Sequence, residues 1–357
     1  MNRKKYAIIL PSLGMGGAER VASEIANEMI KHNNYVQFIL LDNNDVYYKL
    51  DRRIKVDFMD YDEKKNKIIK NYYRIKKLRC FLKKESIDIV ISFLTSANFL
   101  AILSAIGTNT KVFVSERSNP NIDSTIIKFI RKILYRMADG CVFQTTDAMN
   151  LFKGKIRRNS IVIENPVKSN LPRWSNYKKH DDSIVTACRL EKSKNIPMLL
   201  LAFSKIIMKY DEFKLLIFGD GPEKENIYHL IEKMNLKNNV FLMGKDINWH
   251  VMAVKCRIFV LSSDYEGMSN SLLEALAMGM PVVSTDHPIG GAKALINNNE
   301  NGFLVPVNDS DAMAESLFKI ISNKELQNNF SKNAEKICQT LSISNITNKW
   351  LKYVNKE

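Results

Sequence analysis

The chain has 357 residues, a length at which a single hydrophobic core stops growing, so we expect two domains. A composition of 45% apolar and 25% charged residues is ordinary for a soluble α/β protein. No apolar run approaches the roughly 18–20 residues that a membrane-spanning helix needs.

The net charge of +15 is unevenly distributed along the chain. Residues 1–170 hold 30 Lys and Arg against 17 Asp and Glu, whereas residues 171–357 hold 23 against 21. A basic excess in one half predicts a polyanionic partner: nucleic acid, an anionic membrane face or a phosphorylated substrate. The five cysteines lack the spacing of disulfide frameworks or zinc sites, which favours reduced thiols in a cytoplasmic protein.

The first predicted unit is a strand, a glycine loop and a helix. The loop contains Gly14, Gly16 and Gly17, and the helix covers residues 18–31. Glycine lets the backbone approach a phosphate or a sugar closely, and a helix N-terminus favours negative charge. The loop lacks the third glycine of the dinucleotide fingerprint, but Asp42 ends the next strand as a ribose-binding acid would. A nicotinamide-dependent oxidoreductase therefore remains an alternative.

Residues 64–84 are the most unusual part of the first half, with ten Lys and Arg and no acid. Apolar residues recur there at near-helical spacing, which predicts a basic amphipathic helix. Its charged face, with Lys70, Arg74 and Lys77, would bind phosphates or anionic lipid. The alternative is a solvated helix that packs one apolar stripe on the sheet, formed by Ile68, Tyr72, Ile75 and Leu82.

A second basic stretch, residues 128–136, repeats this pattern more briefly. Two such faces on one domain favour an anionic membrane surface as the partner. We expect no nucleic acid, because no interleaved aromatic platform or known nucleic-acid-binding motif is present. A non-catalytic polyanion-binding protein remains a second alternative.

Strand and helix patterns alternate throughout both halves, which predicts an α/β protein with two doubly wound, Rossmann-like domains facing a cleft. Residues 165–183 lose this periodicity and collect Pro, Asn, Ser and charge, as an interdomain linker would. We expect a first domain over residues 1–170 and a second over residues 171–340. A last helix over residues 340–357 would pack back on the first domain.

In the second domain, polar and glycine-rich loops follow the predicted strands. Arg189 and Lys194 follow a strand over residues 184–188, where they would hold a diphosphate or remain solvated loop charges. Gly219 and Gly221 follow the next strand in the same way. Open α/β sheets bind ligands beyond the carboxyl ends of their strands, so these loops are candidate binding loops.

Two carboxylates accompany a later strand, loop and helix. Glu266 lies in a loop rich in Gly, Ser and Asn, where it has no evident structural duty. Glu274 lies in a helix over residues 271–278, whose N-terminus would suit a phosphate. Ser271 and Glu274 also have the spacing of a capping box, so Glu274 has a purely structural alternative.

These residues resemble the retaining glycosyltransferases of family 4, which have the GT-B fold, over nearly the whole chain. The strongest matches are a Glu-x7-Glu pattern, formed by Glu266 and Glu274, and an Arg-Leu…Lys-Asn pattern that contains Arg189 and Lys194. Common phrases of the family also match at three places: residues 16–20, 219–222 and 301–306.

The resemblance implies a role for each of these residues. Arg189 and Lys194 would neutralise the departing diphosphate of the donor, and Glu266 would bind hydroxyls of the transferred sugar. Glu274 would bind the ribose hydroxyls. The donor site would further contain the backbone around Asn270, Ser271, Leu272, Gly219 and Gly221.

On the acceptor side, the expected phosphate-binding residues are Gly16, Gly17, Lys70, Arg74, Lys77 and Arg117. Arg117 stands where many family members have His, and because arginine is no base at neutral pH, we expect it to bind a phosphate instead. Ala294 stands where the family often has Glu, so one polar contact is missing. We expect surface loops rather than a metal site at two acidic pairs: Asp60 and Asp62, and Asp309 and Asp311.

More finely, the chain is similar to bacterial transferases that extend undecaprenyl-diphosphate-linked oligosaccharides, including N-acetylgalactosaminyltransferases. This likeness lies in residues 91–94, 115–119, 285–287 and 344–346. It implies transfer of a hexose or N-acetylhexosamine from a UDP-sugar to a lipid-diphosphate-linked oligosaccharide, without metal or cofactor. It also implies a cytoplasmic protein that lies peripherally on the inner face of the cell membrane. Transfer to another lipid or to a soluble sugar remains an alternative.

Overall fold

The computed structural model describes residues 4–42, 45–59, 66–117, 119–176 and 179–356. Asp60 and Asp62 lie outside these ranges, as do residues 64–65, 118 and 177–178 of the stretches discussed above. The chain divides into two compact units. The first contains Met1–Pro166 and Ile343–Glu357, and the second contains Val167–Ser342.

The first unit is built on a seven-stranded parallel sheet with the strand order β3-β2-β1-β4-β5-β6-β7. Its strands are β1 (Lys5–Leu10), β2 (Tyr35–Leu40), β3 (Lys55–Phe58), β4 (Ile89–Phe93), β5 (Lys111–Ser115), β6 (Gly140–Phe143) and β7 (Ser160–Val162). The central strands are buried along almost their whole length, because a parallel sheet is covered on both faces. In the middle of the sheet, Ile8 pairs with Phe38 on one side and with Ile91 on the other.

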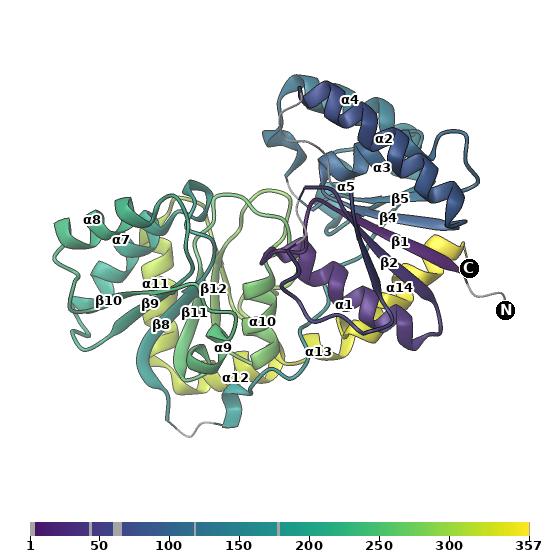
Figure 1. The fold of residues 1–357 in the computed structure, drawn as a ribbon. Helices are drawn as coiled ribbons and strands as arrows, with labels where there is room; N and C mark the ends of the chain where they lie inside the picture. The colour runs from purple at the N-terminus through teal and green to yellow at the C-terminus, as the bar shows by residue number, and fades with distance from the viewer. Residues whose placement is uncertain (1–3, 43–44, 60–65, 118, 177–178, 357) are drawn as a thin grey trace. The chain divides into compact units, whose positions relative to one another are not determined.

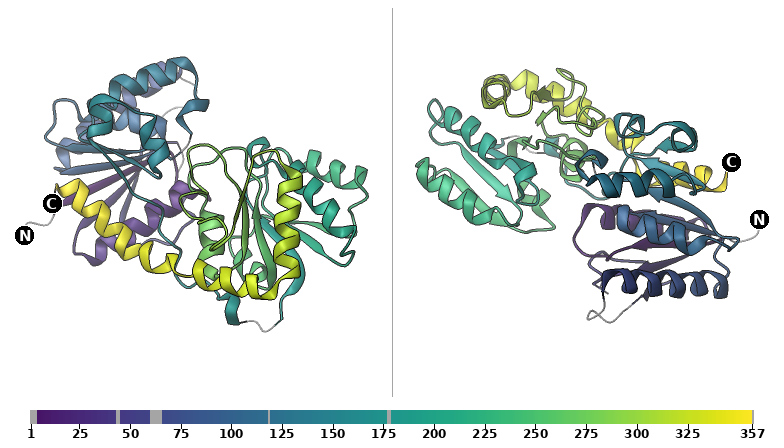
Figure 2. Two further views of the ribbon diagram at one scale, coloured as in Figure 1. Left: turned by 180° about the vertical axis from the view of Figure 1, so that it is seen from behind. Right: turned by 90° about the horizontal axis from the view of Figure 1, so that it is seen from above.

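Helices cover both faces of this sheet (Figure 1). The helices are α1 (Gly17–Lys31), α2 (Lys67–Lys84), α3 (Thr95–Ala105), α4 (Thr125–Leu134), α5 (Thr146–Asn150), α6 (Gly154–Arg158) and α14 (Ile343–Asn355). α1 and α14 pack together on one face, and the view from behind shows α14 in yellow beside α1 in purple (Figure 2). On the other face, α3 contacts both α2 and α4.

The last helix completes the core of the first unit. Trp350 of α14 is fully buried, with its ring centroid 5.8 Å from that of Phe93. Tyr353 contacts Phe113 edge to face, and its hydroxyl donates to the carbonyl oxygen of Asn159 at 2.6 Å. The apolar face of this helix therefore stabilises the first unit, although the helix follows the second unit in sequence.

The second unit contains a six-stranded parallel sheet with the order β10-β9-β8-β11-β12-β13. Its strands are β8 (Asp181–Ala187), β9 (Lys214–Phe218), β10 (Val240–Gly244), β11 (Cys256–Leu261), β12 (Val282–Thr285) and β13 (Phe303–Val305). Its α-helices are α7 (Ile196–Ile207), α8 (Lys224–Lys233), α9 (Trp249–Ala253), α10 (Asn270–Met278), α11 (Ser310–Ser322), α12 (Lys324–Ala334) and α13 (Ile337–Thr340).

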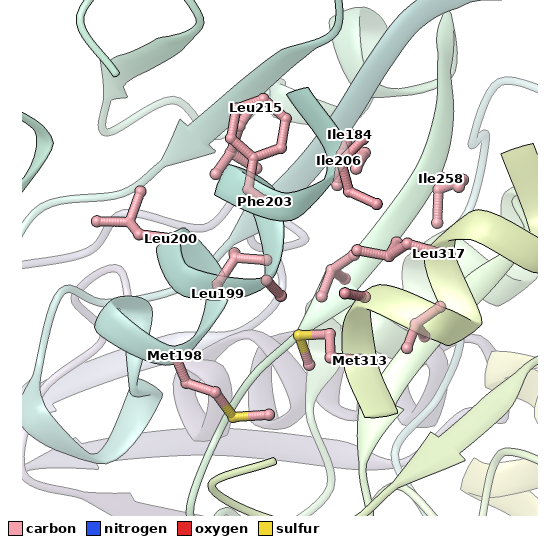
Figure 3. Packing of buried hydrophobic residues seen from close by; sticks show 14 of the residues in the cluster. Ile184, Met198, Leu199, Leu200, Phe203, Ile206, Leu215, Ile258, Met313 and Leu317 are labelled. Atoms are coloured by element: carbon pink, nitrogen blue, oxygen red, sulfur yellow. The ribbon is translucent and has the colours of Figure 1, made fainter. Parts of the chain in front are cut away.

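One large apolar cluster fixes the helices on one face of this second sheet. Leu199 and Phe203 of α7 and Leu317 of α11 pack over Ile184 and Ile258 of the central strands (Figure 3). Successive strand residues point to opposite faces. The neighbouring side chain of β11, Phe259, therefore lies against the other face, where it contacts Trp249 of α9.

Both sheets reverse their strand order beside the first strand of the unit. The neighbours at these points are β1 and β4 in the first unit, and β8 and β11 in the second. Ligands of open α/β sheets bind beyond the carboxyl ends of the strands at such points. The loops after these four strands are therefore candidate binding loops.

The polar segment expected to be a linker is mostly part of the second unit. Trp174 is buried, and its Nε1 donates to the carbonyl oxygen of Cys256 at 2.9 Å. Arg173 donates to the carbonyl oxygen of Ala277 at 3.2 Å. Composition alone missed this packing, because one tryptophan anchors a stretch that is otherwise polar.

The orientation of α2 differs from the predicted stripe. Its buried residues are Arg74, Leu78 and Leu82, whereas Tyr72 is 63% exposed. The side chain of Ile68 is outside the described part of the structure. Arg74 donates to the carbonyl oxygen of Leu41 and pairs with the carboxylate of Asp42 at 2.7 Å. A long arginine stem covers apolar surface well, so Arg74 takes a core-facing position that the prediction gave to tyrosine.

Among the described residues, no helix has both the length and the apolar character to span a membrane.

Candidate active site

The loop after β8 is fixed by one asparagine. Asn195 adopts a left-handed conformation with φ 45° and caps α7, accepting the N–H of Met198 at 3.2 Å. Its side-chain nitrogen donates to Asp264 at 2.7 Å and to Asn308 at 2.6 Å. These contacts connect the loop after β8, which carries Lys194, to the loops after β11 and β13.

Lys194 and Glu266 meet at the point where the strand order reverses. The Nζ atom of Lys194 lies 2.8 Å from Oε1 of Glu266, and Ser263 donates to Oε2 at 3.1 Å. Ser262 donates to the carbonyl oxygen of Lys194 at 2.7 Å. Both charged side chains are largely shielded from solvent, so their attraction is less screened than that of a surface pair. The structure thus brings together two of the three residues predicted to be catalytic.

Arg189, the third, lies on the same loop with its side chain 72% exposed. Its Nε forms an ion pair with Glu191 at 3.0 Å. In this state its guanidinium faces solvent and a neighbouring carboxylate.

Sequence reasoning missed His287 as a site residue. His287 is buried, and its Nδ1 lies 3.2 Å from the carbonyl oxygen of Pro288. Burial lowers the pKa of His287, and the charge of Lys194 acts in the same direction, while Pro288 and Glu266 oppose them. The ring is then neutral near pH 7, with the proton on the nitrogen that faces the carbonyl oxygen.

The other ring nitrogen, Nε2, is a buried acceptor without a hydrogen-bond partner among the described residues. Thr285, two residues earlier at the end of β12, donates to the carbonyl oxygen of Ser263 at 2.5 Å. His287 is therefore held beside the loop that carries Glu266. Its position two residues beyond the end of β12 is where open α/β sheets bind ligands.

The start of α10 corrects the capping prediction. The N-cap is Ser269, not Ser271, and its hydroxyl accepts the N–H of Leu272 at 3.4 Å. Asn270 and Ser271 open the helix, and Ser271 contacts the Ser269 hydroxyl at 3.1 Å. The N–H of Leu272, expected to face a phosphate, is thus directed at Ser269.

Glu274 is the fifth residue of α10 and is buried. At that position it is too far along the helix to be the third-residue partner of a capping box. A buried carboxylate is stabilised by hydrogen bonds or a charged partner, and the capping box does not supply them here.

Gly219 and Gly221 allow two loops to approach closely. Gly219 has φ +137°, and a Cβ there would lie 1.8 Å from the carbonyl oxygen of Cys188. A Cβ on Gly221 would lie 2.4 Å from the carbonyl oxygen of Leu190. Both glycines therefore fit the loop after β9 against the loop that carries Arg189.

In the first unit, the predicted glycine loop is occupied by contacts of its own. Gly16 caps α1, donates to the carbonyl oxygen of Gly14 at 2.9 Å and accepts from the Tyr48 hydroxyl at 3.0 Å. The Glu19 carboxylate lies against Gly16, and burial raises its pKa. Gly17 is the first helical residue. A carboxylate thus already faces the helix N-terminus that was expected to bind a phosphate.

Arg117, just beyond β5, has a different environment. It donates to the Asn165 side-chain oxygen at 2.5 Å and lies over the ring of Phe93, 4.8 Å from its centroid. Its Nε and Nη2 atoms are buried, and no hydrogen-bond partner for them occurs in the described part of the chain. Burial, followed by the charge of Arg20, lowers the pKa of Arg117 to about 9. Arg117 therefore remains charged near neutral pH with two donors directed at no protein group of that part.

Arg20 supplies the second positive charge at this place. It is buried, pairs with Glu24 at 2.9 Å and donates to the carbonyl oxygen of Pro166 at 3.2 Å. The charge of Arg20 disfavours the charged form of Arg117, and an anion beside the two guanidinium groups would offset that effect. The pair is a candidate anion site at the carboxyl edge of the first sheet.

The three residues predicted on α2 are not equivalent. Lys77 is exposed and Lys70 is half-buried. Arg74 is buried in its ion pair with Asp42, which corrects its assignment as a phosphate-binding or lipid-binding charge. The same pair engages the carboxylate that the oxidoreductase alternative assigned to a ribose.

Within the described residues, no group of three or more His, Cys, Asp and Glu side chains is arranged to hold a metal ion. Asp309 caps α11 by accepting the N–H of Ala312 at 2.8 Å. Asp311 pairs with Lys205. This acidic pair therefore has structural contacts on both members.

Comparison with known proteins agrees with this architecture. Residues 168–337 match the family model described as Glycosyl transferases group 1. Two curated relatives come from Campylobacter jejuni subsp. jejuni. One is the alpha-1,4-N-acetyl-D-galactosaminyltransferase named for GalNAc-alpha-(1->4)-GalNAc-alpha-(1->3)-diNAcBac-PP-undecaprenol, 26% identical over 98% of both chains. The other is N-acetylgalactosamine-N,N'-diacetylbacillosaminyl-diphospho-undecaprenol 4-alpha-N-acetylgalactosaminyltransferase, 28% identical over 98% of this chain and 99% of the relative.

A solved structure has the same fold over the whole length. Anabaena Alr3699/HepE, in complex with UDP and glucose, superposes with a TM-score of 0.85 at 16% identity, covering 99% of this chain and all of the other. The fold and these relatives define a glycosyltransferase with the GT-B fold. The match to the group 1 glycosyl transferase model is confined to residues 168–337, which form most of the second unit. This class displaces the oxidoreductase and the non-catalytic alternatives.

Proposed function

We propose that the chain is a retaining glycosyltransferase that moves a hexose or N-acetylhexosamine from a UDP-sugar to a polyprenyl-diphosphate-linked glycan. The observation that carries this proposal is the contact between Lys194 and Glu266 at the strand-order reversal of the second unit. The relatives named for undecaprenyl-linked acceptors and the neighbour solved with UDP and glucose support the two substrates.

In this proposal the donor diphosphate is bound by cations that the loop after β8 supplies. Lys194 exchanges its contact with Glu266 for the diphosphate, and Arg189 turns from Glu191 to the same group. As the bond from the anomeric carbon to the diphosphate oxygen breaks, negative charge develops on the leaving group. Preorganised cations stabilise that charge more in the transition state than in the ground state. No metal or other cofactor is required by this arrangement of charges.

The released Glu266 carboxylate accepts hydrogen bonds from hydroxyls of the transferred sugar. The neutral Nε2 of His287 accepts from a further donor hydroxyl, and Glu274 binds the ribose. The acceptor hydroxyl attacks the anomeric carbon from the face that the diphosphate leaves, and its proton passes to the departing diphosphate. Configuration at the anomeric carbon is therefore retained.

On the first unit, we assign Arg117 and Arg20 to the diphosphate of the lipid-linked acceptor. The two unsatisfied donors of Arg117 match the oxygens of a phosphate, and the planar guanidinium favours paired hydrogen bonds. The assignment places the protein peripherally at the inner face of the cell membrane, where the basic first half meets anionic lipid.

A panel of UDP-sugars, assayed with a polyprenyl-diphosphate-linked oligosaccharide, tests the function. We expect one donor to be turned over, with the product keeping the anomeric configuration of the donor by NMR. Inversion would contradict the retaining step. Equal turnover with free sugars or other lipids would contradict the acceptor class, and no turnover or hydrolysis of any UDP-sugar would contradict the donor.

A further inference from the structure

Helix α4 exposes its apolar residues and buries a charge. Ile126 is 71% exposed and Phe129 64%, and Ile133 on the same face is exposed as well. Arg131 of this helix is 2% exposed. A helix on the surface of a water-soluble unit normally has the opposite arrangement. A contiguous apolar face of this kind marks an interaction surface.

A buried network fixes this orientation. The Nε of Arg131 lies 3.1 Å from a carboxylate oxygen of Glu116, and its Nη2 pairs with Asp123 and donates to Thr95 at 3.1 Å. The Tyr135 hydroxyl donates to the same Glu116 at 2.8 Å. Turning the apolar face inward would leave buried charges without partners, which costs far more than exposing a few isoleucines. The exposed face is therefore built into the fold.

The charges around the apolar face identify its partner. Residues 124–138 contain four Lys and Arg and no acid, and with Arg131 buried the exposed ones are Lys128, Lys132 and Arg136. Helix α2 also exposes Ile69, Tyr72 and Tyr73, and α3 contacts both helices in one layer (Figure 1). A second copy of this basic face would be repelled, whereas anionic lipid would be attracted.

We propose that α4 is a membrane-docking helix, which inserts Ile126, Phe129 and Ile133 at the acyl boundary of an anionic bilayer. Lys128 and Lys132 then lie at the level of the lipid phosphates. The inference rests on the proposed function, because a lipid-linked acceptor requires the enzyme at a bilayer. It goes beyond charge attraction by the basic first half, because apolar insertion persists at salt concentrations that screen surface charge.

Vesicle flotation of the full-length protein tests the proposal, with phosphatidylcholine alone and mixed with phosphatidylglycerol. We expect binding to the mixed vesicles that is partly retained at high salt. The double variant Ile126→Ser/Phe129→Ser should bind about tenfold or more weakly, because two large side chains no longer enter the bilayer. The matched control is Met208→Ser/Val251→Ser, which removes two exposed apolar side chains of the second unit and should change binding less than about twofold.

A second readout keeps the test independent of folding and of catalysis. Phe129→Trp should show a blue-shifted fluorescence on mixed vesicles and quenching by brominated lipid. Unchanged flotation of the double variant, or no spectral shift, would overturn the proposal. The proposal would also be overturned if the wild type sedimented as a dimer and the double variant as a monomer, with unchanged vesicle binding. Vesicle binding without any sugar transfer would refute the proposed function but would still support α4 as a membrane-docking helix.

Discussion

The carboxyl edges of the two sheets differ in how their charged side chains are paired. In the second unit, Lys194 and Glu266 satisfy each other, and the surrounding loops are fixed by Asn195 and Ser263. In the first unit, Arg117 keeps buried donors that no described residue satisfies. One edge is thus preorganised with its charges paired, whereas the other holds buried arginine donors without a partner among the described residues.

The largest expected effect falls on the preorganised site. Glu266→Gln removes the negative charge that holds Lys194 and replaces one of the two acceptor oxygens with a donor. We expect the transfer rate to fall by roughly 100-fold or more. Initial-rate assays at saturating donor measure it. The matched control is Glu212→Gln, an exposed carboxylate of the same unit outside the site, which should stay within about threefold of wild type. Equal losses in both variants would remove the distinction between the two carboxylates.

Arg117→Met tests the other side of the comparison. The variant keeps the stem over Phe93 and removes the unsatisfied donors. We expect KM for the lipid-diphosphate acceptor to rise roughly 10–100-fold, because charged hydrogen bonds to phosphate are lost. KM for the UDP-sugar should not move. Arg173→Met, an arginine of the second unit, is the control. A rise confined to KM for the UDP-sugar would show that Arg117 acts on the donor and would contradict its assignment to the acceptor.

His287→Phe sharpens the description of the donor site. The substitution removes the buried acceptor and keeps a flat ring of similar size. We expect KM for the UDP-sugar to rise about tenfold, and His287→Gln, whose amide oxygen can accept, to recover part of it. Since burial lowers the pKa of His287, the wild-type KM should stay low in mildly acidic buffer. A wild-type KM that rises as soon as the pH drops below neutral would contradict a neutral acceptor.

The smallest effect concerns the stability of the second unit. Burial lowers the pKa of His250 to about 4, with a further contribution from Lys168. Between an ordinary histidine pKa of about 6.5 and this value, the unfolded chain binds the additional proton. Stability should therefore fall as the pH falls through this range. Urea unfolding of His250→Gln should show a shallower decrease, by roughly 1–2 kcal/mol, than that of exposed His229→Gln. An equal pH dependence of the free energy of unfolding in the two variants would contradict the lowered pKa of His250.

Much of the fold follows from local pattern. Buried apolar runs such as Ile89–Phe93 and the alternation with helices predict the parallel sheets. The sequence also singled out Lys194 and Glu266 beyond buried strands, Glu266 because it has no evident structural duty and Lys194 with a solvated loop charge as the alternative. The structure adds that they contact each other, which requires the order β8–β11 and is invisible in a linear sequence.

Other features depend on which of several similar residues wins a position. Ser269 caps α10 instead of Ser271, since the helix begins one residue earlier than the periodicity predicts. Arg74 takes a core-facing place because Asp42 and the carbonyl oxygen of Leu41 are there to receive it. The exposed apolar face of α4 depends on partners of Arg131 that lie in two other segments of the chain. Hydrophobic periodicity finds such a helix but not the side that faces the protein.

A double-mutant cycle on the transfer rate tests whether Lys194 and Glu266 act as one unit, which exchanges its internal contact for the donor. Lys194→Met and Glu266→Gln should each lower the rate severely, and the double variant should be about as slow as the slower single variant. Losses that simply multiply in the double variant would show two independent residues and would contradict the account.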